Sequence, residues 1–355
     1  MNRSFIILVI VFTILNSCQQ DNSAKKKNYE IKTFQSKNIK YKTLKGQKFV
    51  YNQIQVPTSI IKVNSKIVVS EMAGDTLISV INAEDMTFDY KFGQEGMGPG
   101  EFYKIWNLYP SSETNQFWIY CPETKISTLY NLAEGEIEKT YKQTSDDVLA
   151  VQFAPTYRNS FIGIKADGSY QFAEFSNKGS EIAGFNTWDG YVEKSEDIPK
   201  NVIASVHQGK LFSNPNQNKF ALACIKRDMI EVLDLKDSSI LSIRGPENII
   251  PEFTVDYSAG YPMALTNRET DVYCYYGAYL SEKYIYGLYS GETSIDVNQN
   301  HSDIAKIIYK FSYAGELIDS YKLDISIQNI HVDEKEGKIY GVTTDESPGI
   351  AVFTM

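Results

Sequence analysis

Histidine and cysteine are scarce in this chain of 355 residues, which contains 3 His and 4 Cys. Such low numbers exclude a disulfide framework and a histidine-rich metal cluster. Basic residues are also in deficit, because 35 Lys and Arg stand against 44 Asp and Glu, a formal net charge of −9. A nucleic-acid-binding protein needs a basic face to neutralise phosphates, so we expect no nucleic-acid partner.

Aromatic residues are abundant, with 25 Tyr, 18 Phe and 3 Trp, a composition that suits strands better than helices. Hydrophobic residues make up 43% of the chain and charged residues 22%, so a sizeable core can be buried and global disorder is excluded. The length exceeds that of an average domain but fits one large all-β barrel or propeller.

The N-terminus has the features of a secretion signal. Arg3 precedes the uncharged run Phe5–Leu15, which as a helix would be about 16 Å long, too short for a hydrocarbon core of about 30 Å. The sequence Leu15-Asn16-Ser17-Cys18 that follows resembles the bacterial lipoprotein box. That resemblance implies cleavage before Cys18 and lipid on its sulfur and new α-amino group; a secretory peptide with a chance Cys is the alternative.

We therefore predict a signal peptide over residues 1–17, the lipidated Cys18 with a flexible tether over 18–38, and one domain over 39–355. The polar run after Cys18 lacks apolar periodicity, which is typical of a linker. Gln19 is not the acidic residue that resembles an inner-membrane retention signal. We expect attachment through the lipid to the outer membrane, in a leaflet that the sequence leaves open.

One unit recurs beyond residue 55: an apolar alternating strand, a second such strand, a turn and a third strand. Gly135, Gly179 and Gly315 stand at the same offset in three of the turns, where glycine supplies a positive φ. Six copies begin near Lys66, Phe117, Ser160, Lys219, Lys283 and Lys338, at steps of 43 to 64 residues. Steps of this size match one four-stranded propeller blade.

The predicted fold is an all-β, six-bladed β-propeller, with seven blades as the alternative. The innermost strands are expected at Thr58–Val63, Lys104–Tyr109, Val148–Phe153, Ala204–Phe212, Val272–Tyr279 and Gln328–Val332. The last copy reaches the C-terminus with its third strand, so its fourth must come from elsewhere. The strand-like segment Tyr29–Gln55 has no other blade to join, so we expect an N-terminal strand to complete the last blade and close the ring.

The linkers between copies carry a recognisable string. Residues Phe92–Phe102 read FGQEGMGPGEF, and a degenerate copy covers Ile243–Phe253. This string resembles the linker of six-bladed propeller lipoproteins of the TolB-like or NHL-like type, and the resemblance implies a fold and an envelope location but no activity. A phosphate-binding loop is disfavoured, because Pro99 removes a backbone donor and the following residues have a strand pattern rather than a helix pattern.

Three long insertions, Asn186–Ile203, Pro246–Asp271 and Gly291–Asp303, extend connections that open on one face of a propeller. Aromatic rings and an arginine on such a rim suit sugars, peptides or a protein patch. His331 lies on a predicted innermost strand and could face the channel. The candidate ligand-binding residues are therefore Tyr103, Trp106, Trp188, Tyr191, Tyr257, Tyr261, Arg268 and His331; for each aromatic, packing beneath a loop is the structural alternative.

The sequence contains no convincing metal-binding or catalytic motif. Asp296, Asn298 and Asn300 open like a calcium loop, but His301 and Ile307 occupy the places that need Gly and Glu, so we predict no metal site. No nucleophile motif is present, and we assign no catalytic residue and no cofactor. Cys121, Cys224 and Cys274 are expected to be buried free thiols.

The predicted function is a lipid-anchored envelope module that binds a protein, peptide or glycan without catalysis. The alternative is a hydrolase or lyase that acts on glycans or lactones with acidic residues at the channel mouth. A convergence of carboxylates there would favour the enzyme, whereas an aromatic rim without one would favour binding.

Overall fold

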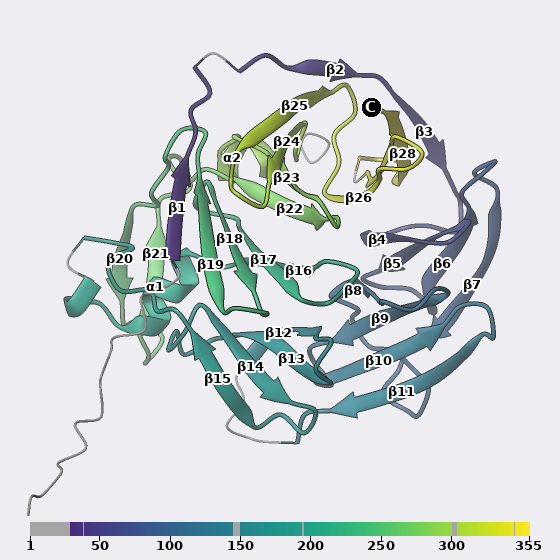
Figure 1. Ribbon diagram of the computed structural model, residues 1–355, viewed down its shortest axis with the longest axis horizontal. Coiled ribbons are helices and arrows are strands. Elements are labelled where there is room, and N and C mark those ends of the chain that lie inside the picture. The colour runs from purple at the N-terminus through teal and green to yellow at the C-terminus, as the bar shows by residue number, and fades with distance from the viewer. Residues whose placement is uncertain (1–28, 38, 145–149, 194, 300–303, 344) are drawn as a thin grey trace, which may run out of the picture.

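Six blades stand in a ring around a central axis (Figure 1), as the sequence predicts. The structure is a computed structural model that describes residues 29–37, 39–144, 150–193, 195–299, 304–343 and 345–355. The signal peptide, Cys18 and the first part of the tether lie outside the described residues.

Each blade is an antiparallel sheet whose first strand lies innermost. The strands of blades 1 to 3 are β4 (Pro57–Val63), β5 (Lys66–Glu71), β6 (Thr76–Asn82) and β7 (Phe88–Gln94); β8 (Asn107–Pro110), β9 (Gln116–Cys121), β10 (Ile126–Asn131) and β11 (Glu136–Lys142); and β12 (Ala150–Pro155), β13 (Ser160–Lys165), β14 (Phe172–Ser176) and β15 (Glu181–Phe185).

Blades 4 and 5 are built in the same way and are followed by the three C-terminal strands of blade 6. Their strands are β16 (Gly209–Ser213), β17 (Lys219–Cys224), β18 (Met229–Asp234) and β19 (Ser239–Arg244); β22 (Tyr275–Leu280), β23 (Tyr284–Tyr289), β24 (Ile307–Ser312) and β25 (Leu317–Leu323); and β26 (Asn329–Asp333), β27 (Lys338–Val342) and β28 (Gly349–Thr354).

The N-terminal segment closes the ring and continues along its outside. Strand β3 (Gly46–Val50) pairs antiparallel with β28 as the outermost strand of blade 6, which confirms the predicted closure. Two further pairings were not predicted: β1 (Tyr29–Thr33) adds parallel to β19 of blade 4, and β2 (Lys42–Leu44) adds parallel to β25 of blade 5. Residues 29–37 and 39–50 thus form a strap across three blades that covers edges which would otherwise be unpaired.

The strap corrects the predicted tether, because residues 29–33 pair in a sheet instead of belonging to a flexible linker. One innermost strand is also corrected. The segment predicted as the strand Ala204–Phe212 begins in helix α1 (Lys200–Val206) and becomes β16 only at Gly209. The apolar residues of α1 cover a segment so short that their spacing does not distinguish a helix from a strand.

The turns follow the predicted chemistry. Gly135, Gly179 and Gly315 have φ values of 72°, 89° and 77°, in the left-handed region that glycine adopts without strain. The glycine-rich string at residues 92–102 connects blade 1 to blade 2 as a turn: Glu95 bridges Phe102, and the backbone N–H of Gly98 donates to the Glu101 carboxylate at 2.7 Å.

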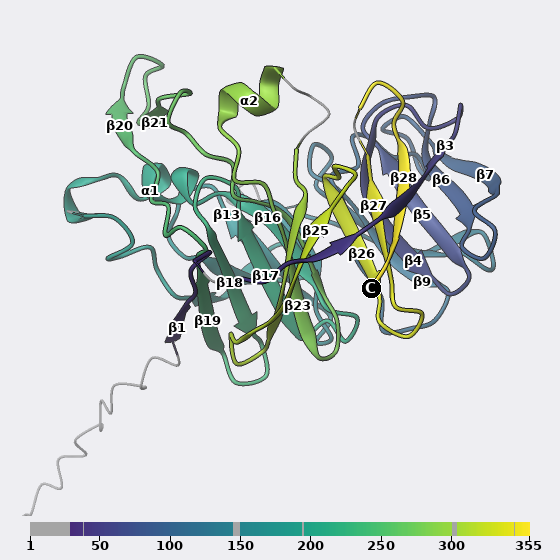
Figure 2. The same cartoon turned by 90° about the horizontal axis from the view of Figure 1, so that it is seen from above.

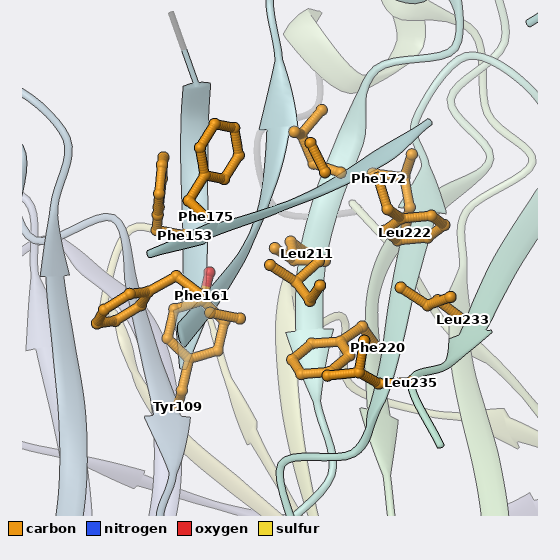
Figure 3. Close-up of a cluster of buried hydrophobic side chains, with 14 of the residues drawn as sticks. Tyr109, Phe153, Phe161, Phe172, Phe175, Leu211, Phe220, Leu222, Leu233 and Leu235 are labelled. Atoms are coloured by element: carbon orange, nitrogen blue, oxygen red, sulfur yellow. The ribbon is translucent and has the colours of Figure 1, made fainter. Parts of the chain in front are cut away.

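The core lies between neighbouring blades. Figure 3 shows the largest cluster, in which aromatic rings of blade 3, among them Phe153 and Phe175, lie beside Leu211 and Phe220 of blade 4. Hydrogen bonds also join the inner strands near the centre of the ring. The Asn107 side chain donates to the Leu211 carbonyl at 2.8 Å and accepts a hydrogen bond from the Ser59 hydroxyl at 3.0 Å, which joins the inner strands of three blades.

Candidate functional site

The long insertions gather on one face of the ring (Figure 2), where helix α1, helix α2 (Ser294–Gln299) and the hairpin of β20 (Phe253–Asp256) and β21 (Met263–Thr266) project beyond the blades. We call this the loop face. It is formed by the connections from one blade to the next and by those between second and third strands. The opposite face carries the connections between first and second strands, and we call it the tight face.

The β20–β21 hairpin exposes two of the predicted residues at its tip. Tyr257 is 61% exposed and Tyr261 is 59% exposed. Leu265, on β21, and Ile250, ahead of β20, are exposed on the same insertion. Large apolar side chains that cluster on a projecting element mark an interaction surface, whereas single ones are ordinary.

The hairpin is held in place at its base. Strand β21 contacts α1, and the Asn201 side chain donates to the Pro262 carbonyl at 2.9 Å. A cavity of about 330 Å³ lies between the hairpin and the body of the propeller, lined by Tyr261, Met263 and Lys226 among others. An isolated two-stranded hairpin is marginally stable in water, so this support matters for presenting the tip in one place.

Trp188 and Tyr191 lie inside the molecule and not on the rim. Trp188 is only 3% exposed, and its ring stacks on His207 with centroids 5.0 Å apart. The Arg227 guanidinium donates to the Tyr191 carbonyl at 2.8 Å and to His207 Nε2 at 2.6 Å. These residues fasten the first insertion to blade 4, which is a packing role and not a binding role.

A buried carboxylate continues this network, and sequence reasoning missed it. Glu231 is fully buried on β18, where its Oε1 accepts hydrogen bonds from Tyr191 at 3.0 Å and Ser242 at 2.7 Å. Tyr29 of the strap joins through a 2.5 Å contact between its hydroxyl and that of Tyr191, and it accepts from Arg244 at 2.9 Å. Burial raises the pKa of Glu231 to about 7. The network joins the strap to the loop face, and nothing local in the sequence reveals it.

The remaining rim candidates lie apart from the hairpin. Trp106 is 47% exposed and Tyr103 is half-buried, and both stand on the connection from blade 1 to blade 2. The hairpin belongs to the connection from blade 4 to blade 5, on the other side of the ring. Arg268 is exposed just after β21. The structure therefore brings Tyr257, Tyr261 and Arg268 onto one insertion but does not join them to Trp106.

His331 lies on β26 at the tight face. It lines a cavity of about 490 Å³ there, and a second of about 20 Å³ among the inner strands. Carboxylates do gather around the larger cavity, but two of them are already paired: Lys62 Nζ lies 2.5 Å from Asp333 and 2.6 Å from Glu336. Across the residues that the structure describes, no group of three or more His, Cys, Asp or Glu could hold a metal ion.

The three described cysteines lie in separate blades, and all are buried free thiols. Burial raises the pKa of each, to about 11 for Cys121. A thiol needs a lowered pKa and access to be a good nucleophile, so these side chains are inert structural residues. Within the described ranges, no helix is long and apolar enough to span a membrane.

Comparison with known proteins agrees with this architecture. Residues 31–335 match the family described as TolB-like 6-blade propeller-like. A crystal structure of a "Putative exported protein" from Bacteroides fragilis NCTC 9343 is similar in fold, with a TM-score of 0.55 and 8% sequence identity over 92% of this chain and 98% of that one. No curated protein sequence matches. The family match spans most of the chain, and the chain therefore belongs to the TolB-like six-blade propeller family.

Proposed function

We propose that this protein is a lipid-anchored binding module of the cell envelope that docks a protein partner on its loop face. The observation that carries this proposal is the β20–β21 hairpin, which holds Tyr257 and Tyr261 in solvent at its tip. Tyrosines anchor protein interfaces because they bury a large area at a small cost in side-chain entropy. The exposed aliphatic Ile250 and Leu265 favour a protein over a glycan, because they add apolar area without the polar groups that orient a sugar.

The point where the N-terminal segment joins the propeller also supports a loop face that is directed away from the membrane. Strand β1 runs parallel to β19 with Tyr29 opposite Ile240, so the chain enters blade 4 at the end remote from the hairpin. The eleven peptide units from Cys18 to Tyr29 reach at most about 40 Å. Because the short tether leaves the propeller at the end opposite the hairpin, the hairpin lies on the side away from the membrane, where a partner can reach it. Two or more acyl chains on Cys18 would give stable attachment, since one chain binds a membrane only marginally.

The partner proposal is tested by quantitative affinity capture from the native envelope. The double variant Tyr257→Ser/Tyr261→Ser is compared with Tyr157→Ser, which removes a tyrosine that is 49% exposed on the tight face. We expect a specific protein to be captured by the wild type and by Tyr157→Ser and to be depleted at least tenfold with the double variant. Equal capture by all three proteins would overturn the proposal.

The anchor is tested separately. Cys18→Ser should move the protein from the membrane fraction to the soluble fraction and abolish incorporation of labelled fatty acid, whereas Cys121→Ser should change neither. Labelling that persists in Cys18→Ser would contradict the lipoprotein assignment.

The enzymatic alternative has less support. Asp333 and Glu336 share the Lys62 ammonium, and Glu334 accepts hydrogen bonds from Ser281 and Tyr286 at 2.8 Å each. These carboxylates are held by protein partners, and no pair of them is poised as acid and base.

A further inference from the structure

The tight face carries a cavity that the docking proposal does not use. It measures about 490 Å³, within the range of small-molecule sites. Its walls come from the first strands and first connections of several blades, at the end of the central channel. Since the hairpin projects from the opposite face, a ligand here would not compete with a partner docked there.

A buried histidine without a partner lies in the wall of this cavity. His331 is 9% exposed, and among the described residues neither of its ring nitrogens has a hydrogen-bond partner. Its ring contacts the Tyr279 ring edge-on, with centroids 4.6 Å apart and an angle of 65° between the planes. Burial lowers the pKa of His331 to about 3, so the ring is neutral and offers one N–H donor and one lone pair. A hydrogen-bonding group of a ligand in the cavity can use either ring nitrogen.

The charge of the cavity selects the ligand. Its lining contains five carboxylates, on Glu113, Glu282, Asp333, Glu334 and Glu336, against the two ammonium groups of Lys62 and Lys335, a net charge of −3.

Lys62 pairs with Asp333 and Glu336, and together with Lys335 it balances these two carboxylates. The three remaining carboxylates, on Glu113, Glu282 and Glu334, make up the negative excess. The Tyr279 ring is also in the wall, where it can contact a cation through its face. An anion would be repelled here, and a neutral ligand would leave the carboxylates uncompensated.

We propose that this cavity binds a small organic ammonium compound, with its cationic group toward Glu334 and Glu282 and a hydrogen-bonding group on the His331 ring. The inference is independent of the partner proposed for the loop face.

The test uses matched probes and the full mature chain. Glucosamine is compared with N-acetylglucosamine, and cadaverine with pentane-1,5-diol, by isothermal titration calorimetry at low ionic strength. In at least one pair, the ammonium member should bind at least tenfold more tightly than its neutral counterpart. No preference in either pair, or no binding by either ammonium probe at millimolar concentration, would overturn the proposal.

Two variants test whether the ammonium probe binds in this cavity. Glu334→Gln keeps a hydrogen-bond acceptor for Ser281 and Tyr286 but removes the charge. It should lower the affinity for the ammonium probe at least fivefold. Glu252→Gln, an exposed carboxylate on the loop face, should leave the affinity unchanged. If both variants bind like the wild type, the site is not this cavity.

A direct readout avoids reliance on variants that fold poorly. The chain has 3 histidines, so their ring C–H signals can be resolved by NMR and the His331 signal assigned with His331→Gln. Saturating probe should shift the His331 signal and leave that of His207, which is buried against Arg227, in place. A shift at His207 alone, or at neither ring, would contradict the assignment.

Discussion

Phe353, in the last strand of the chain, lies directly opposite Gly46 of the strap, and its ring fills the space that a Cβ at position 46 would need. A Cβ there would come within 2.5 Å of the ring, which is fully buried. The closure of the propeller therefore depends on a glycine at one end of the chain and an aromatic ring at the other.

Gly46→Ala should destabilise the protein by about 1–3 kcal/mol, because the buried ring has to move to admit the methyl group. The matched control is Gly277→Ala, where the nearest atoms lie 3.7 Å from an added Cβ and the change should be within about 1 kcal/mol of neutral. Urea unfolding of the three proteins measures both effects. Equal stability of Gly46→Ala and wild type would contradict a tightly packed closure.

Replacing a buried aromatic residue of the loop face should destabilise the protein much more than replacing an exposed one. Trp188→Ala removes a buried ring that stacks on His207 and should cost about 3–5 kcal/mol. Tyr257→Ser, at the solvent-exposed tip of the hairpin, should change the free energy of unfolding by less than about 0.5 kcal/mol. Thermal or urea denaturation gives the comparison, and a large loss in Tyr257→Ser would mean that the tip packs against the body.

The buried His207 should make the protein less stable in acid. Its Nδ1 contacts the Ile203 carbonyl at 2.7 Å and its Nε2 accepts from Arg227, so the ring is neutral. Burial and the neighbouring Arg227 charge lower its pKa to about 3. An unfolded histidine takes up a proton near pH 6.5 that the folded one refuses, so stability falls as the pH drops from 6.5 toward 3, by at most about 1.4 kcal/mol per pH unit.

Glu231, in the same hydrogen-bond network, changes the stability with pH in the direction opposite to His207. Its raised pKa means that the folded state binds a proton which the unfolded state releases, so its contribution to stability is lost as the pH rises from about 4.5 to 7. On lowering the pH from 7 to 5, Glu231→Gln should lose more stability than wild type and His207→Gln should lose less. Unfolding free energies at the two pH values provide the check, and parallel slopes for all three proteins would refute it.

Thiol chemistry should follow burial. Cys121, Cys224 and Cys274 are buried and their pKa values are raised, so iodoacetamide at pH 8 should label none of them in the folded protein. All three should react once guanidinium unfolds the chain, as intact mass spectrometry can show. Rapid labelling of any one of them in the native state would place that thiol nearer the surface than the structure does.

The blades could be predicted from the sequence because their strands and turns are specified by residues that are close together in the chain. Strands such as β5 and β17 are short apolar segments bounded by turns, and the turn at Gly135 needs a residue that tolerates a positive φ. The segment Tyr29–Gln55 was recognised as strand-like, but the pairing of β1 and β2 with blades 4 and 5 was missed. These two strands join sheet edges by parallel backbone pairing and expose most of their side chains, so no apolar pattern specifies their partners.

The site was less predictable than the fold because its residues meet only in three dimensions. Tyr257 and Tyr261 are visible as aromatics in a long insertion, and their exposure agrees with a rim. Trp188 has the same appearance in sequence, yet it is buried on His207, a contact that only the folded loop creates. The hydrogen bond between Tyr191 and Glu231 joins residues 40 positions apart, and no local pattern specifies that distance.

The central claim, that the hairpin tip is the docking surface, is tested most directly by photo-crosslinking in living cells. A photoreactive phenylalanine is placed at position 257 on the loop face or at position 157 on the tight face, in chains that are otherwise unchanged. The account predicts one dominant crosslinked protein from position 257 and none of that protein from position 157. The same crosslinked protein from both positions, or from position 157 alone, would contradict it.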